Sequence, residues 1–229
     1  MSVKLVVFDL AGTTVKDNND VSKAFQSALK KYGYSIPLEL INPIMGYEKN
    51  EAITKMLNTH EPDQSKITGS LVSLIHKEFV AQMISHYQFS EDIEPLPEVE
   101  DTFRALHEMG IQIGLNTGFS RDIADAIVNR LQWREQGMID YLVGSDEVER
   151  GRPYPFMIEK MMHEAGISKA DEVVKVGDTE VDVREGQNTG CLYVIGVTTG
   201  AFSREELEKY NPTHIVDSLS AILPVIKNQ

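Results

Sequence analysis

From residue 99 to residue 226 short apolar runs alternate with amphipathic segments, and few folds have this alternation. The apolar runs, which predict strands, cover residues 111–115, 141–143, 173–176, 192–197 and 214–216. The segments between them have apolar residues at helical spacing and predict helices over 99–109, 121–131, 155–165, 181–189, 203–209 and 219–226. Strands that alternate with helices predict a parallel sheet covered on both faces. With a further apolar run at 3–8, the sequence predicts an α/β fold with a Rossmann-like, doubly wound parallel sheet.

The segment between the first strand and this alternating part has a different pattern. Apolar residues recur at helical spacing in 22–32, around 53–57 and in 71–83, and no convincing strand interrupts them. Pro95-Leu96-Pro97 then closes the segment like a linker. We therefore expect a Rossmann-like core domain formed by 1–17 and 95–229, and an inserted α-helical cap domain formed by 18–94.

Charge and composition narrow the kinds of partner. The 229 residues carry 35 acidic against 22 basic groups, for a net charge of −13, which argues against binding nucleic acid or an anionic membrane through bulk charge. No apolar run approaches the roughly 18 residues of a membrane span, and the N-terminus lacks the pattern of a secretory signal. A single cysteine cannot form an intramolecular disulfide. We expect a cytoplasmic protein with a small-molecule partner, and the sequence leaves the oligomeric state open, a homodimer included.

Polar residues follow the predicted strands at the points where ligands bind in open α/β sheets. They are Asp9, Gly12, Thr13 and Thr14 after the first strand, Thr117 and Gly118 after the second, Arg152 before a later helix, and Asp178, Thr179 and Asp182 after the 173–176 strand. One edge of the sheet thus collects carboxylates, hydroxyls, glycines and an arginine.

This set of groups points to chemistry at phosphorus. Carboxylate oxygens without thiols or imidazoles suit Mg²⁺. Hydroxyls, the amides of a glycine loop and a guanidinium suit a phosphate or phosphonate, so Gly12, Thr13, Thr117 and Gly118 are candidate phosphate-binding residues. An aspartate such as Asp9 can attack phosphorus, while a metal ion and Arg152 neutralise the charge on the transferring group.

Each piece also has an ordinary explanation. The Asp9 motif alone is a common turn, the Gly177-Asp178-Thr179 motif alone is a helix N-cap, and Arg152 alone is a surface charge. Their common position at strand ends favours the catalytic interpretation over these separate ones.

The motifs at these positions resemble those of the haloacid dehalogenase superfamily, whose members use an aspartate nucleophile and carry a helical cap after the first strand. The resemblance spans residues 5 to 182. It implies that Asp9 is the nucleophile and a metal ligand, that the Ala11 carbonyl and Asp178 also bind Mg²⁺, and that Asp182 holds the metal's water shell. It further implies that Thr117 and Gly118 bind phosphoryl oxygens and that Arg152 stands where most members have lysine.

The residue at position 11 points to one subgroup of this superfamily. Most phosphatases of this superfamily have an acid–base aspartate there, and alanine cannot transfer a proton. One subgroup, the phosphonoacetaldehyde hydrolases, is known for the same substitution. The segments 9–15, 117–121, 151–157 and 174–179 resemble that subgroup's motifs, including the arginine for lysine.

The cap segment adds a candidate catalytic lysine. Met45-Gly46-Tyr47-Glu48-Lys49 aligns with the subgroup's Met-Gly-x-x-Lys motif, which implies that Met45 contacts substrate and that Lys49 forms a Schiff base with an aldehyde. A neutral amine is required for this, and burial favours one. A noncovalent contact to a substrate anion and a solvated lysine on the cap loop are the alternatives.

The chain departs from the subgroup at three places near the substrate. Asn19, Ala52 and Phe119 stand where the subgroup has cysteine, histidine and tyrosine. The sequence therefore predicts an Mg-dependent hydrolase acting on phosphonoacetaldehyde or a related phosphonate. A phosphatase of a small phosphomonoester is one alternative, and a noncatalytic phospho-aspartate signalling or phosphate-binding protein is another.

Overall fold

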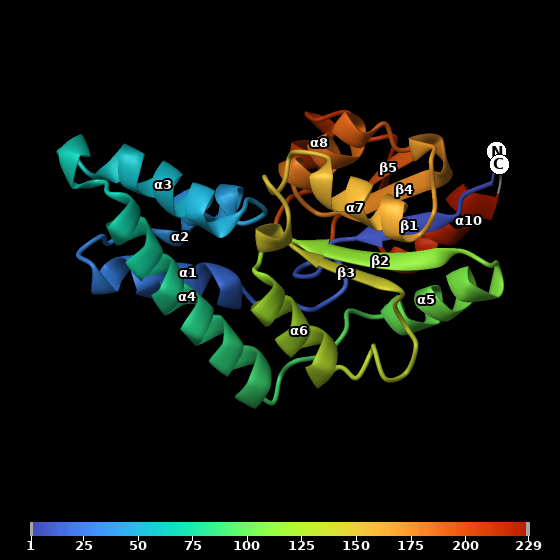
Figure 1. Ribbon diagram of the computed structural model, residues 1–229, viewed down its shortest axis with the longest axis horizontal. Coiled ribbons are helices and arrows are strands. Elements are labelled where there is room, and N and C mark those ends of the chain that lie inside the picture. Colours follow the sequence, from blue (N-terminus) through green and yellow to red (C-terminus); the bar gives the residue numbers. More distant parts are fainter. Residues whose placement is uncertain (1, 228–229) are drawn as a thin grey trace.

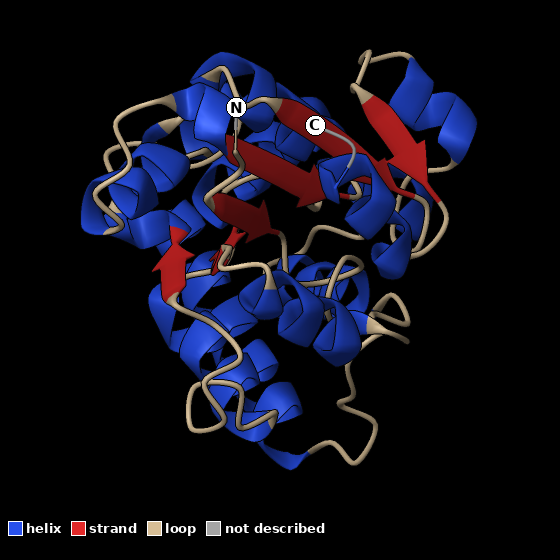
Figure 2. Ribbon diagram, turned by 90° about the vertical axis from the view of Figure 1, so that its right-hand side faces the viewer, coloured by secondary structure: helices blue, strands red, loops and turns tan. Residues whose placement is uncertain are grey.

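The computed structural model describes residues 2–227 and shows one six-stranded, entirely parallel sheet between layers of helices (Figures 1 and 2). Its strand order is β3-β2-β1-β4-β5-β6, the order of a doubly wound Rossmann-like sheet, so the predicted fold class is confirmed. The strands are β1 (Leu5–Phe8), β2 (Gln112–Thr117), β3 (Tyr141–Gly144), β4 (Val173–Gly177), β5 (Tyr193–Val197) and β6 (His214–Val216).

Strand β1 lies in the middle of the sheet and is buried on both faces. Its alternate side chains point to opposite sides, so Val6 and Phe8 join one apolar cluster while Leu5 and Val7 join another. The first cluster includes residues of α5 (Val99–Glu108), and the second includes residues of α7 (Phe156–Glu164). A strand covered on both faces has an uninterrupted apolar sequence, so the apolar run at 3–8 predicted this strand clearly.

The order of the strands reverses at β1. The chain passes from β1 to β2 and β3 on one side, and then returns to place β4 on the other side of β1. Residues following β1 and β4 therefore meet at the carboxyl edge of the sheet, where the two directions of winding leave a crevice.

Four helices fill the segment between β1 and α5, and three of them contain the stretches at helical spacing that the sequence showed. They are α1 (Asp20–Lys31), α2 (Leu38–Ile41), α3 (Lys49–His60) and α4 (Gly69–Phe89), joined by the short 3-10 turns η1 (Asn42–Ile44) and η2 (Gln64–Lys66). Figure 1 shows them as a group beside the carboxyl edge of the sheet. The long helix α4 packs against α1 and α3, and also against α6 (Arg121–Arg130), which follows β2.

Aromatic side chains connect this helical group to the rest of the molecule. The ring of Phe79 in α4 lies 5.7 Å from that of Phe25 in α1 and 6.2 Å from that of Phe119, just after β2. All three belong to the apolar cluster that also covers one face of the sheet. The division into a core of 1–17 and 95–229 and a cap of 18–94 stays a prediction, and its ends at residue 1 and residues 228–229 lie outside the described residues.

The remaining elements complete the layers. They are η3 (Ser145–Glu147), η4 (Ala170–Glu172), α8 (Glu180–Thr189), α9 (Arg204–Glu208), η5 (Leu219–Ala221) and α10 (Ile222–Lys227). Within residues 2–227, none of these helices or the earlier ones is both long and apolar enough to cross a membrane.

Candidate active site

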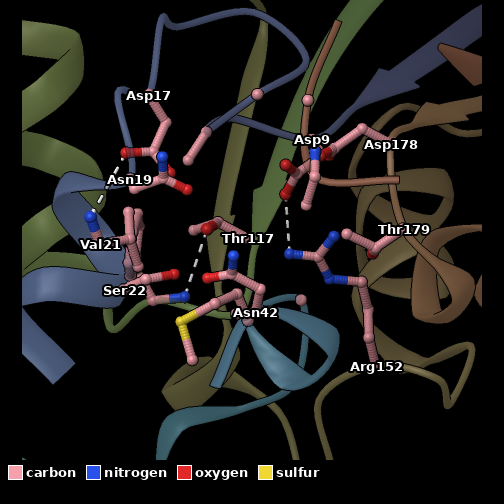
Figure 3. A pocket seen from close by; sticks show the side chains of 18 of the residues that line it. Asp9, Asp17, Asn19, Val21, Ser22, Asn42, Thr117, Arg152, Asp178 and Thr179 are labelled. Atoms are coloured by element: carbon pink, nitrogen blue, oxygen red, sulfur yellow. Dashed lines mark hydrogen bonds and ion pairs between the residues drawn. The ribbon is translucent and has the colours of Figure 1, made fainter. Parts of the chain in front are cut away.

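A cavity of about 140 Å³ opens at the carboxyl edge of the sheet, between the strand ends and helices α1 and α3 (Figure 3). A cavity this small suits a metabolite. The predicted site residues that line it are Asp9, Ala11, Gly12, Met45, Lys49, Thr117, Gly118, Arg152 and Asp178. Thr13 and Asp182 are not in the lining, but each bonds to a residue that is.

Asp9 is the first residue after β1, and its backbone is tied to the neighbouring strand. Its amide donates to the carbonyl of Val176 in β4 at 3.0 Å, and the loop beyond it folds back so that Thr14 donates to the Leu10 carbonyl. Gly12, at φ 87°, turns this loop, and a Cβ there would lie 2.7 Å from Asp178 Oδ2. The sequence therefore needs glycine at this position to bring the loop against Asp178.

Asp9 and Asp178 form a buried pair of carboxyl groups. Asp178 accepts hydrogen bonds from the Thr13 hydroxyl at 3.0 Å and from the Ala201 amide at 2.7 Å. Burial, together with the charges of Asp9 and Asp182, raises the pKa of Asp178 well above its ordinary value. Burial also raises the pKa of Asp9, although Arg152 opposes this.

Arg152 bridges two of the three carboxylates. Its Nη2 donates to Asp9 Oδ1 at 2.7 Å and its Nη1 donates to Asp182 Oδ1, while its Nε is buried and has no partner among the described residues. Burial opposes the charged form of Arg152, but the carboxylates of Asp182 and Asp9 raise its pKa nonetheless. The guanidinium is thus a fixed positive charge at the floor of the cavity.

Asp182 is fully engaged by other protein groups. Besides Arg152, the ammonium of Lys175 lies 3.1 Å from its Oδ1, and Thr179 donates to its Oδ2 from both the amide and the hydroxyl. Burial would raise the pKa of Asp182, but Arg152 and Lys175 outweigh it and the pKa is lowered. Lys175 in turn contacts Glu185 at 3.1 Å and donates to Asn116 at 2.6 Å.

The acidic groups fit a divalent cation. Asp9, Asp178 and Asp182 each offer an oxygen within 4.8 Å of the others. Burial raises the pKa values of Asp9 and Asp178, and a bound cation would stabilise the charged forms of both carboxyl groups. The Ala11 carbonyl oxygen accepts no hydrogen bond from the described residues and, in the predicted role, would complete an all-oxygen donor set.

The loop after β2 meets the segment before α3 closely. A Cβ on Gly118 would lie 2.5 Å from the Tyr47 carbonyl oxygen, and one on Gly46 would collide with Thr179. Thr117, the last residue of β2, accepts a hydrogen bond from the Phe119 amide at 3.2 Å. Glycine at 46 and 118 thus lets the helical group lie directly on the strand ends.

Lys49 is the first residue of α3, not part of a loop as the sequence suggested, because the Glu48 side chain caps the helix by accepting from the amides of residues 50 and 51. The lysine is 2% exposed, and its ammonium donates to the carbonyls of Met45 at 2.5 Å and Tyr47 at 3.0 Å. The Phe119 ring lies 5.2 Å away. Burial, with repulsion from Arg152, lowers the pKa of Lys49 to about 7.

Sequence reasoning assigned no role to two sets of residues here. Lys175, Asn116 and Glu185 form a buried network behind Asp182, and the signal was available, since a lysine inside an apolar strand requires a buried partner. Asp17, Asn19, Ser22 and Asn42 also line the cavity. Asn19 was already placed near the substrate by its alignment with the subgroup's cysteine, whereas Asp17, Ser22 and Asn42 follow no strand and form no motif, so only the fold brings them together.

Comparisons with known proteins indicate the family of this chain. The model of the family described as haloacid dehalogenase-like hydrolase matches residues 6–197. Phosphonoacetaldehyde hydrolase of Bacillus anthracis is 29% identical over 97% of this chain and 87% of that protein.

Two crystal structures share the fold. A phosphonoacetaldehyde hydrolase-like protein from Oleispira antarctica has a TM-score of 0.81 at 23% identity, over 100% of this chain and 92% of that one. A predicted phosphoglycolate phosphatase from Haemophilus somnus 129pt has a TM-score of 0.80 at 20% identity, over 97% of both chains.

Proposed function

The chain belongs to the haloacid dehalogenase-like hydrolases, and from that premise we propose that it cleaves the C–P bond of phosphonoacetaldehyde or a related small β-oxo-phosphonate. The observation that carries this proposal is the state of Lys49. Its amine is buried in the cavity that holds Asp9, and its only hydrogen-bond partners among the described residues are two carbonyl oxygens. Carbonyl oxygens hold an amine in place without supplying the charge that would keep it protonated.

The residue at position 11 supports the same conclusion. Ala11 cannot protonate an alkoxide leaving group, so hydrolysis of an ordinary ester would lack its acid. A carbon leaving group stabilised as an enamine needs no such acid when it departs. An imine formed by Lys49 would therefore make an acid at position 11 unnecessary for departure of the leaving group.

The reaction proceeds through two covalent links to the protein. The Lys49 amine condenses with the substrate carbonyl, takes up a proton and releases water, giving a protonated imine. Asp9 then attacks phosphorus, the C–P bond breaks, and its electron pair moves into the imine to give an enamine. Proton uptake at carbon followed by hydrolysis of the imine releases acetaldehyde and Lys49, and a second water hydrolyses the aspartyl-phosphate to phosphate and Asp9.

Other residues bind and orient the phosphoryl group. Arg152 offers a fixed positive charge beside Asp9, and the loops with Gly12, Thr117 and Gly118 present amides and a hydroxyl to its oxygens. The carboxylates of Asp9 and Asp178 with the Ala11 carbonyl would hold Mg²⁺, which would supply charge neutralisation at phosphorus when bound. Asp182, whose oxygens are engaged by protein groups, fixes Arg152.

Borohydride trapping tests the proposal. Reduction in the presence of phosphonoacetaldehyde should join the two-carbon fragment to Lys49, detected as a mass increase on the peptide that holds it. Lys49→Arg should abolish both the adduct and phosphate release. Lys55→Arg, at an exposed lysine of the same helix, should change neither.

A phosphatase of a small phosphomonoester is the competing function. Turnover of monoesters without any adduct on Lys49 would favour it and overturn the C–P proposal. The noncatalytic alternative is not retained, because the family is one of hydrolases.

A further inference from the structure

The cavity has a second side that the proposed chemistry does not use. Figure 3 shows Asp9, Asp178, Thr179 and Arg152 on one side of the cavity, and this set is called the strand-end side. Opposite them lie four polar side chains that come from the loop before α1, from α1 itself and from η1. This set, called the helical side, consists of Asp17, Asn19, Ser22 and Asn42.

Polar atoms on the helical side lack protein partners. The side-chain oxygen of Asn42 is buried and accepts no hydrogen bond from the described residues. Ser22 is 3% exposed, yet its hydroxyl makes no hydrogen bond within the described part of the chain. Buried polar groups are nearly always paired, so groups left open at a cavity wall indicate that a ligand or water completes them.

The charge on this side is negative. One oxygen of Asp17 accepts from the amides of Asp20 at 2.7 Å and Val21 at 3.3 Å, and no lysine or arginine among residues 2–227 forms an ion pair with it. Burial raises its pKa, which the two amides oppose. A ligand that brings hydrogen-bond donors is favoured here, whereas a second anionic group would be repelled by the carboxylate of Asp17.

From the open acceptors and the unpaired carboxyl group, we infer that the helical side binds a hydroxyl-bearing end of the substrate. The preferred substrate then carries a hydroxymethyl group, rather than a hydrogen or a carboxylate, on the far side of the carbonyl that Lys49 attacks. Ser22 and Asn42 are the specificity-determining residues. This inference rests on the proposed function only for the identity of the bond that is cleaved.

Two matched series of compounds test it. The first is X–CO–CH₂–PO₃²⁻ and the second is X–CO–CH₂–O–PO₃²⁻, each with X as H, CH₃, CH₂OH or COO⁻. The series that releases phosphate tests the proposed function, and the order of X within it tests the helical side. The two ideas can therefore fail separately.

We expect kcat/KM to be highest when X is CH₂OH. It should exceed the value for CH₃ by on the order of 10-fold and the value for COO⁻ by more. Ser22→Ala and Asn42→Ala should each lower the ratio of kcat/KM for CH₂OH to that for CH₃ toward 1. Asn58→Ala, at an exposed asparagine of α3 outside the cavity, is the matched control and should leave the order intact.

Equal values for CH₃ and CH₂OH, or a preference for COO⁻, would overturn the inference whichever bond is cleaved. If neither series is turned over, Kd values measured by calorimetry for the same compounds and the same two variants test the inference. The tightest binding is then expected when X is CH₂OH. In that case the proposed function fails while the inference about the helical side is still tested.

Discussion

The strand-end side and the helical side of one cavity differ in how their polar groups are paired. At the strand ends Arg152 bridges Asp9 and Asp182, Lys175 joins Asp182 to Glu185, and Thr13 holds Asp178. On the helical side Ser22, Asn42 and one oxygen of Asp17 have no partner among the described residues.

This difference separates binding of the phosphoryl group, which the candidate substrates share, from binding of the rest of the substrate, which varies. Groups already fixed by neighbours need little reorganisation when a phosphoryl group arrives, and a phosphoryl group is common to all the candidate substrates. Unpaired groups are free to take up whatever the rest of the substrate offers. The comparison predicts large, general losses from changes at the strand ends and smaller, substrate-dependent ones from changes on the helical side.

The largest expected effect is that of Asp9→Asn. An amide cannot attack phosphorus, so kcat should fall by at least about 10³-fold for every substrate. Phosphate release under single-turnover conditions measures this. Asp17→Asn is the counterpart on the helical side, and with phosphonoacetaldehyde it should cost less than about 10-fold. Similar losses in the two variants would contradict the division of tasks.

Lys175→Met should be the most destabilising change to the paired network. It leaves Asp182 and Glu185 buried without their shared ammonium, which costs about 3–5 kcal/mol in the free energy of unfolding. Urea denaturation followed by circular dichroism measures it. Lys16→Met, which removes an exposed ion pair with Glu94, should leave the urea midpoint nearly unchanged. A midpoint for Lys175→Met that matches the wild type would show that the network does not carry buried charge.

Gly118→Ala tests the contact between the loop after β2 and the segment before α3. The added methyl group would lie 2.5 Å from the Tyr47 carbonyl oxygen, so the helical group must move outward and carry Lys49 with it. A displacement of this kind should lower kcat/KM by about 10²-fold with only a modest change in thermal stability. Gly69→Ala, where nothing lies within 4 Å, should have no effect on activity.

The smallest expected effect is the pH dependence of Lys49. Its ammonium faces Arg152, which lowers its pKa, and the carboxylates of Asp9, Glu48 and Asp17, which raise it, while burial brings it to about 7. Between pH 6 and pH 8 the neutral fraction should rise about tenfold, and the initial rate of adduct trapping should rise with it. A trapping rate that rises only near pH 10 would contradict this environment.

The same lysine should affect stability, with a sign that follows from its lowered pKa. Between pH 7 and pH 10.5 the unfolded chain holds a proton that the folded chain has lost, so stability rises with pH in this window. Lys49→Met should therefore stabilise the protein most at pH 7 and below, and progressively less toward pH 10. Thermal melts across this range give the measurement, and a gain independent of pH would argue against the buried amine.

The sequence predicted the strand-end side far better than the helical side, for a physical reason. Parallel strands end at one edge, so Asp9, Thr117 and Asp178 could be grouped from strand positions alone. Ser22 shares a helical face with Phe25 and Leu29, and that periodicity marks it as inward-facing without saying what it meets. Asn42 lies in a 3-10 turn that no sequence pattern predicted. Lys49 was found through its motif, but its place at the start of α3 depends on the Glu48 cap.

The central position of β1 has a consequence for how the protein comes into being. Leu5 pairs with Gln112 on one side and with Val173 on the other, so the first strand synthesised cannot acquire its second neighbour until most of the chain has left the ribosome. The helices of residues 20–89 depend on contacts nearer in sequence and can form earlier. Asp9 is thus synthesised early but meets its partners late, so a nascent chain carries its proposed nucleophile without the neighbours that complete the site.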